Sequence, residues 1–263
     1  QPAREMDALI LVLRGFKDPV VPGGDSVDPL RDLAEIRGEL ILTDLVITDR
    51  RLEKLAEKQR KPSFTEDEKK EQALLQRVKP QLEAEKNVSA LGLSVEEARR
   101  LAGFCFLSGK PFVTVLSVEG GTPDAGILDS IRKLAGGEVI AVPARNELEI
   151  LQLPEEDRAA FLEGYGIKEL QRDPIIAAAY RAAGLISFFT AGDKEVRAWT
   201  IHLGDTAPRA AGAIHSDFER GFIRAEVVSF VDYVQYGGVK GAKERGHYRL
   251  EGKEYLVREA DIV

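Results

Sequence analysis

The sequence predicts an α/β protein in three parts: an α/β domain, two long helices that interrupt it, and a small α+β module. Unbroken apolar runs at residues 9–13, 112–116 and 139–142 predict the strands of the first part. Residues 28–82 carry apolar side chains at helical spacing, and residues after Gly184 alternate as in exposed sheets. These patterns give the fold class and no chemistry.

Composition narrows the classes of function. The 263 residues carry 37 Lys and Arg against 44 Asp and Glu, and this net charge of −7 excludes a globally cationic nucleic-acid coat but not a local basic face. One cysteine excludes an internal disulfide and a cysteine zinc site, and three scattered histidines argue against a histidine-rich metal site. No apolar run approaches the roughly 20 residues that a membrane-spanning helix needs. We therefore predict a cytoplasmic protein.

The first part is predicted to form a parallel sheet. An apolar run bounded by turn signals, such as residues 9–13 between Asp7 and Gly15, is typical of a strand buried on both faces. A helical stretch at 127–134 lies between the two later runs, so together they form a βαβ unit. Further helices are predicted from about Pro154 and from about Pro174.

The interruption reads as an antiparallel helical hairpin. Asp28 and Pro29 form a helix start, and a stripe of leucines and isoleucines continues to about Arg60. After a break at residues 61–64, a capping box at 65–68 begins a second helix, which Pro80 is predicted to kink. The basic side chains of this arm are either a solvated face or a nucleic-acid contact.

The last part reads as strands around short helices. Residues 195–201 and 222–228 are predicted strands, and 208–215 is a predicted short helix. Residues 248–250 and 255–257 flank a turn and predict a hairpin. Neither a Gly-x-x-x-x-Gly-Lys-Ser/Thr loop nor a Gly-x-Gly-x-x-Gly motif occurs in the sequence. His215-Ser216-Asp217 holds triad residue types, but consecutive residues do not converge as a triad does.

Longer motifs resemble those of one family, the YchF/Obg-like ATPases. The segments that match its C-terminal TGS domain are Phe188–Thr200, Ala207–Val227, Ala242–Gly246 and Arg249–Tyr255. Upstream, Asp7–Ala8, Val27–Asp32 and Glu39–Leu45 are similar to the same family, so the resemblance covers nearly the whole chain.

The resemblance implies a three-domain nucleotidase that uses ATP or GTP with Mg²⁺. Residues 1–27 and 105–183 would be the remainder of a Ras-like nucleotide domain, 28–104 its coiled-coil insertion, and 184–263 a β-grasp TGS domain. The chain begins after the point at which the family has its phosphate loop, switch regions and Mg²⁺-binding groups. We therefore expect a longer natural polypeptide, and no nucleotide hydrolysis by this chain alone.

The base-binding motif departs from the family pattern. At the end of the strand that follows Lys110-Pro111, the family has Asn-x-x-Glu where this chain has Ser117, Val118, Glu119 and Gly120. A second motif, Ser-Ala, stands here as Pro143-Ala144. Ser117, Val118, Glu119 and Ala144 are the candidate base contacts, and these departures leave the choice between ATP and GTP open.

The resemblance also implies that the partner is the ribosome, and we expect binding neither to a membrane nor to DNA. Cationic side chains of the last part are candidate RNA contacts, although neighbouring acids could cancel them: Lys194, Arg197, Arg209, Arg220 and Arg224. The alternative is an RNA- or ribosome-binding adaptor that has lost nucleotide use, which the altered positions Ser117 and Pro143 favour.

Overall fold

The computed structural model describes residues 2–20, 24, 26–120, 123–192 and 195–263. The chain divides into two compact units, residues 1–179 and residues 180–263. Each unit has its own sheet and its own apolar core, and each is described by itself below.

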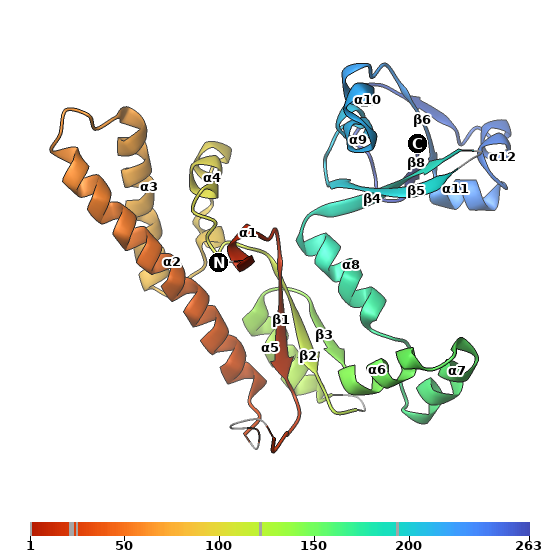
Figure 1. Ribbon diagram of the computed structural model, residues 1–263, viewed down its shortest axis with the longest axis horizontal. Coiled ribbons are helices and arrows are strands. Elements are labelled where there is room, and N and C mark those ends of the chain that lie inside the picture. Colours follow the sequence, from red (N-terminus) through yellow and green to blue (C-terminus); the bar gives the residue numbers. More distant parts are fainter. Residues whose placement is uncertain (1, 21–23, 25, 121–122, 193–194) are drawn as a thin grey trace. The chain divides into compact units, whose positions relative to one another are not determined.

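A three-stranded parallel sheet forms the centre of the first unit (Figure 1). Its strands are β1 (Leu9–Arg14), β2 (Phe112–Ser117) and β3 (Val139–Val142), in the order β1-β2-β3. Leu9 pairs with Phe112, and Thr114 pairs with Val139. The predicted parallel strands and the βαβ unit are confirmed, with α5 (Ala125–Ala135) as the connecting helix.

One face of this sheet packs against α5 and the first turns of α2 (Pro29–Gln59). Leu13 and Leu116 are adjacent in the register and share a core with Leu33 of α2 and Ile131 of α5. These four side chains are at most 2% exposed, so each removes close to its full apolar area from water.

The opposite face is covered unevenly. Val113 and Val115 of β2 are buried, whereas Ile10 and Val12 beside them on β1 are 48% and 64% exposed. The prediction that the first strand is buried on both faces is therefore wrong for β1. Side chains along a strand alternate between its two faces, and in β1 Leu11 and Leu13 face the core shared with α2, whereas Ile10 and Val12 point to the opposite face.

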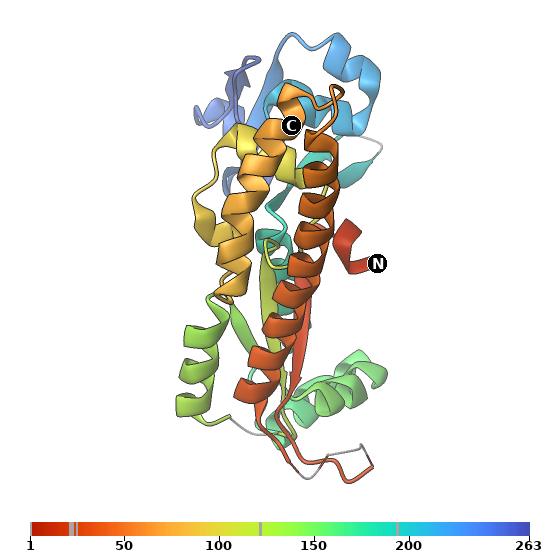
Figure 2. The same cartoon turned by 90° about the vertical axis from the view of Figure 1, so that its left-hand side faces the viewer.

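The long helix α2 continues beyond the sheet and packs against α3 (Glu66–Glu83), which runs beside it in the opposite direction (Figure 2). The predicted start signals are confirmed, because Asp28 accepts a hydrogen bond from the Arg31 amide and Thr65 forms a capping box with Glu68. Pro80 lies within α3. The buried side chains between the helices are apolar and come from both: Ile41, Leu55, Leu74, Leu75, Val78 and Leu82.

Several short helices complete the first unit, and some were not predicted. Helices α7 (Glu155–Gly164) and α8 (Arg172–Ala182) lie where the sequence placed them. Further elements of the described residues were not predicted, namely α1 (Pro2–Glu5), the 3₁₀ helix η1 (Val88–Leu91), α4 (Val95–Ala102) and α6 (Ala144–Gln152).

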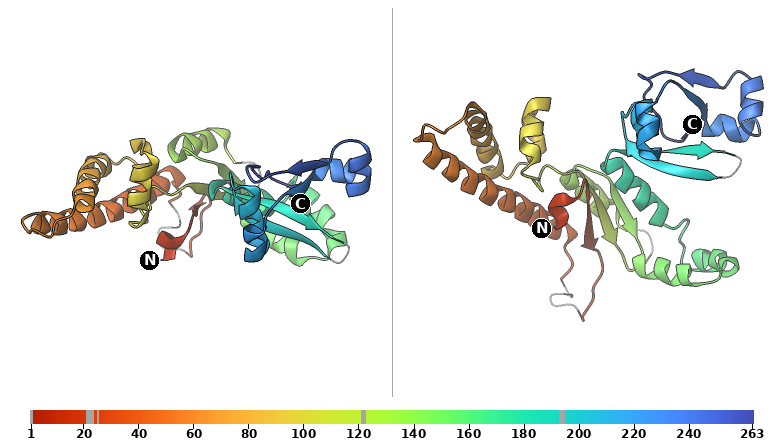
Figure 3. Two further views of the ribbon diagram at one scale, coloured as in Figure 1. Left: turned by 90° about the horizontal axis from the view of Figure 1, so that it is seen from above. Right: turned by 45° about the horizontal axis from the view of Figure 1, so that its top comes forward.

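The second unit is a mixed five-stranded sheet in the order β5-β4-β8-β6-β7. Its strands are β4 (Leu185–Ala191), β5 (Val196–His202), β6 (Ala225–Ser229), β7 (Arg249–Glu251) and β8 (Asp261–Ile262). β4 pairs antiparallel with β5 (Figure 3) and parallel with β8. Helix α9 (Ala207–Ile214) contributes Ala207 and Ala210 to a core around Phe188 and Ile201.

The remaining elements of this unit are α10 (Ser216–Arg220), α11 (Phe230–Gln235) and α12 (Val239–Glu244). The predicted hairpin of residues 248–257 is wrong. β7 pairs with β6 instead, and residues 255–257 form no strand. Only an isolated bridge joins Leu256 to Thr206, because the chain there crosses toward the start of α9 rather than returning along β7.

Candidate functional site

The candidate base-binding residues lie at the carboxyl ends of β2 and β3. Ser117 ends β2 and pairs with Val142, the last residue of β3. The Val118 amide donates to the Val142 carbonyl at 2.9 Å, so the loops that begin at Glu119 and Pro143 start side by side. Ligands of open parallel sheets bind beyond this edge.

The end of β1 joins the same edge. The Gly15 amide donates to the Ser117 carbonyl at 2.7 Å. A Cβ atom on Gly15 would lie 2.9 Å from that carbonyl oxygen and 3.0 Å from Leu116 Cδ1, which is closer than side chains normally approach. Glycine therefore allows the chain after β1 to lie directly against the end of β2.

The four candidates differ in accessibility. Val118 is 8% exposed and belongs to the core with Leu13 and Leu116, so its side chain is structural. Glu119 and Ala144 are exposed, and Ser117 is partly exposed. Glu119 thus offers a carboxylate at this edge, which can accept hydrogen bonds from the donor groups of a ligand.

Arg145 is a residue at this edge that the sequence analysis missed. It lies in the first turn of α6, directly after Ala144, and its side chain is 91% exposed. Its guanidinium is 3.6 Å from the Glu149 carboxylate one turn later. Its position after the second base motif was the only available signal, and a lone arginine in a helix is usually a solvated residue.

A buried carboxylate holds the same helix in place. Glu147 of α6 is 4% exposed, and its two oxygens accept the Gln171 amide at 2.9 and 3.0 Å. Burial raises the pKa of the Glu147 carboxyl, while hydrogen bonds from the Gln171 and Arg172 amides oppose that rise. The Glu147 carboxylate of α6 therefore caps the N-terminus of α8, and this role is structural.

The candidate RNA contacts of the second unit are spread over several elements. Arg197 on β5 stacks over the Trp199 ring at 4.2 Å. Arg220 of α10 pairs with Asp217 at 2.6 Å, and Arg209 of α9 lies 4.0 Å from both Asp205 and Glu219. Lys194 lies outside the described residues. The acids beside Arg209 and Arg220 offset their charge.

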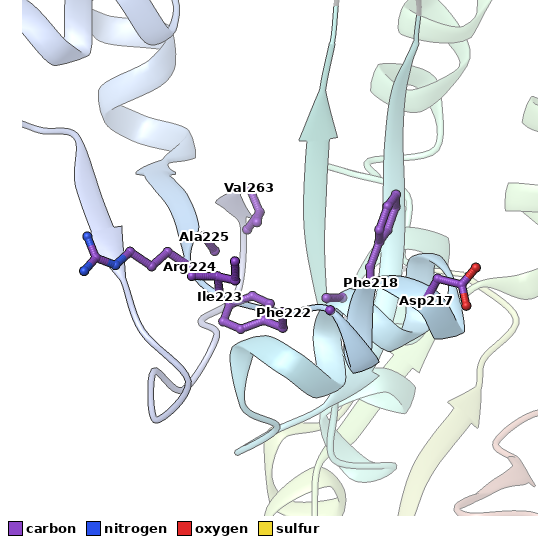
Figure 4. Close-up of a pocket in the computed structure, with 9 residues that line it drawn as sticks. Asp217, Phe218, Phe222, Ile223, Arg224, Ala225 and Val263 are labelled. Carbon is purple, nitrogen blue, oxygen red and sulfur yellow. The ribbon is translucent and has the colours of Figure 1, made fainter.

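Arg224 lies beside an open apolar groove of about 420 Å³ in the same unit. Phe218, Phe222, Ile223 and Val263 line the groove, and the Arg224 guanidinium extends away from Phe218 (Figure 4). Ile223 is 78% exposed. Arg224 is thus accessible but separate from the other cations.

Two absences hold within the described part of the chain. No group of three or more His, Cys, Asp or Glu side chains there is arranged to hold a metal ion. No helix there combines the length and the apolar character that crossing a membrane requires.

The fold and its accessible edge define an α/β protein with one parallel-sheet unit and one mixed-sheet unit. The family model YchF-GTPase_C, described as "Protein of unknown function (DUF933)", matches residues 185–263. The "Ribosome-binding ATPase YchF" of Haemophilus ducreyi is 40% identical over 265 residues, which are 99% of this chain and 72% of that protein. The protein of that name from Bacillus subtilis is 40% identical over 271 residues, 99% and 73% of the two chains.

A solved structure of a similar protein indicates the same family. The Schizosaccharomyces pombe YchF GTPase has a TM-score of 0.84 and 29% identity, covering 98% of this chain and 72% of that one. A GTP-binding protein from Pyrococcus horikoshii shares the fold alone, with a TM-score of 0.57 and 17% identity over 99% and 78% of the chains. The chain belongs to the YchF family.

Proposed function

We propose that this chain is a nucleotide-binding, ribosome-associated protein whose base contacts lie at the carboxyl edge of β1–β3. The observation that carries the proposal is the hydrogen bond from the Val118 amide to the Val142 carbonyl, which places Ser117, Glu119 and Ala144 at one edge. Relatives named for ATPase activity and ribosome binding support it.

The domain assignment is part of this proposal. Residues 1–27 and 105–183 form the nucleotide domain, residues 28–104 its helical insertion, and residues 184–263 a β-grasp TGS domain. Helices α2 and α3 and the mixed sheet of the second unit support these roles. The ligand is ATP or GTP with Mg²⁺, the partner is ribosomal RNA within the ribosome, and the compartment is the cytoplasm.

Photo-crosslinking tests the base site directly. The full chain is irradiated with 8-azido-ATP or 8-azido-GTP, and labelled peptides are mapped by mass spectrometry. We expect label in the segments around residues 117–119 and 144–145, and competition by the unmodified nucleotide. Label confined to α2, α3 or the second unit would overturn the assignment of the base site.

Co-sedimentation with ribosomes tests the partner. We expect the chain to sediment with purified ribosomes at low salt and to dissociate as salt rises, because phosphate contacts release counterions. Absence of sedimentation at low salt would contradict ribosome association.

A second candidate is a ribosome-binding adaptor without nucleotide use. It is favoured by Ser117 and Pro143, which stand where the family has an Asn and a Ser that contact the base. Ribosome sedimentation without any competed photo-label would select this candidate over the first.

A further inference from the structure

A compact basic and aromatic surface lies between α11 and β7 of the second unit. We call residues 236–248 the basic lobe. It contains Lys240, Lys243 and Arg245 against a single acid, Glu244, in a chain of net charge −7. All three cations are exposed. Lys240 and Lys243 lie within α12 (Val239–Glu244), the helix labelled in Figure 1, and Arg245 directly follows it.

The charges of the basic lobe are not neutralised internally. Within the part of the chain that the structure describes, no carboxylate lies within ion-pair distance of Lys240, Lys243 or Arg245. This distinguishes them from Arg209 and Arg220, whose neighbouring acids offset their charge. A cluster of unpaired cations attracts a polyanion.

Aromatic rings lie among these cations. The Lys243 ammonium is 4.7 Å from the centre of the Tyr248 ring, and the rings of Tyr236 and His247 are 4.9 Å apart. The two imidazole nitrogens of His247 are both engaged, Nδ1 with the Asp232 carboxylate at 3.0 Å and Nε2 with the Tyr236 hydroxyl at 3.3 Å.

The backbone and α11 hold the His247 ring in one orientation. The His247 amide donates to the Ala242 carbonyl at 2.9 Å, and the Ser229 hydroxyl donates to Asp232 at 2.6 Å. His247 nevertheless keeps 42% of its side chain exposed. A fixed, exposed ring loses little conformational freedom when a planar group stacks on it.

We propose that the basic lobe binds single-stranded RNA, with Lys240, Lys243 and Arg245 on phosphates and the His247 ring under a base. Unstacked bases bind proteins through aromatic rings and a cationic path for the backbone, and this combination favours RNA over an acidic protein. The inference rests on the proposed ribosome association and names the surface that carries it.

Fluorescence anisotropy with a labelled single-stranded RNA of about 12 nucleotides tests this surface. The triple variant Lys240→Gln, Lys243→Gln, Arg245→Gln should bind at least about tenfold more weakly than the unmodified chain. Its plot of log affinity against log salt should be shallower by about 2, since each phosphate contact on a single strand contributes about 0.7. The double variant Arg132→Gln, Arg172→Gln, at exposed arginines that pair with Asp129 and Asp173 in the first unit, is the matched control and should change affinity less than about twofold.

His247→Ala separates stacking from charge. It should weaken binding of the single strand by about fivefold or more and leave the salt dependence unchanged. Binding to a duplex RNA of the same length should not change, because paired bases do not stack on protein rings. Circular dichroism of each variant checks that the helices remain folded.

Ribosome co-sedimentation in parallel separates this inference from the proposed function. Suppose that the unmodified chain sediments with ribosomes. If the triple variant then binds RNA with the same affinity as the unmodified chain, the basic lobe is not the RNA surface. If the triple variant loses sedimentation but keeps RNA binding, the lobe contacts a protein, and the inference is also overturned. If the unmodified chain does not sediment at all, the proposed ribosome association fails.

Discussion

The Arg4 guanidinium lies 3.1 Å from the Asp44 carboxylate, which is fully buried in the middle of α2. The same carboxylate accepts the Leu107 amide at 3.0 Å and the Ser108 amide at 2.7 Å. Arg4 also donates to the Cys105 carbonyl at 3.0 Å. One buried acid therefore joins α1, α2 and the turn that leads into β2.

Asp44→Asn should destabilise the first unit by about 3 kcal/mol, because the Arg4 charge loses its partner and one buried amide loses its acceptor. Urea unfolding followed by circular dichroism measures the loss. Hydrogen exchange supplies a local readout, since the amides of Leu107 and Ser108 should lose protection first.

Asp49→Asn is the matched control on the same helix. Asp49 pairs with Lys79 at 2.7 Å but is 40% exposed, so this change should cost about 0–1 kcal/mol. Equal costs for the two substitutions would show that Asp44 does not organise the turn.

Gly15→Ala tests the close approach of the chain after β1 to the end of β2. Its Cβ would lie 2.9 Å from the Ser117 carbonyl oxygen, so the substitution should displace that edge and destabilise the first unit by about 1–3 kcal/mol. Thermal unfolding measures the change. Exchange of the Val118 amide should also increase, because its bond to Val142 lies at the same edge.

Gly38→Ala is the control for the Gly15→Ala substitution. A Cβ on Gly38 meets nothing within 4 Å, and the residue lies inside α2. Alanine should therefore stabilise the helix by about 0.5–1 kcal/mol. A destabilised Gly38→Ala protein, or an unaffected Gly15→Ala protein, would refute the steric argument.

The buried Glu147 carboxyl should make the free energy of unfolding depend on pH. Because burial raises the pKa of this carboxyl in the folded protein, the folded state binds its proton more tightly than the unfolded chain does. Its stabilising contribution is complete below the unfolded pKa of about 4.3 and is lost as the pH rises through the raised folded pKa.

Glu147→Gln removes this titration. The stability of the unmodified chain relative to the variant should therefore be greater at acidic pH and should decrease as the pH rises. Urea unfolding across that range measures the difference. A difference that grows with pH would mean that the amide hydrogen bonds outweigh burial.

Much of the fold follows from local patterns. The parallel strands are predictable because their apolar runs are bounded by turn signals, and the long helices because Asp28 and Thr65 cap them. The prediction of a hairpin at residues 248–257 was wrong because the residue pattern of a strand does not identify the strand with which it pairs. The partner of β7 is β6, more than 20 residues earlier in the sequence, as the pairing of Leu250 with Glu226 shows.

The candidate sites were less predictable. Sequence placed Ser117 and Ala144 after strands, but only the register shows that these ends adjoin. The sequence suggested that neighbouring acids could offset Arg209 and Arg220, and the structure identifies these acids as Asp205 and Glu219 beside Arg209 and Asp217 beside Arg220. The basic lobe was missed because its ring contacts, such as that of Lys243 with Tyr248, depend on the tertiary fold.

Ser117→Asn is the most direct gain-of-function test of the proposed base site. The asparagine amide supplies both a hydrogen-bond donor and an acceptor at the end of β2, where serine supplies one hydroxyl. If a purine binds at this edge, one added hydrogen bond should tighten binding of ATP or GTP by about three- to tenfold. Equilibrium binding of both nucleotides to the full chain measures the gain and shows which base benefits. Ser130→Asn on the exposed surface of α5 is the control and should leave binding unchanged. Equal affinities for Ser117→Asn and the unmodified chain would place the base elsewhere.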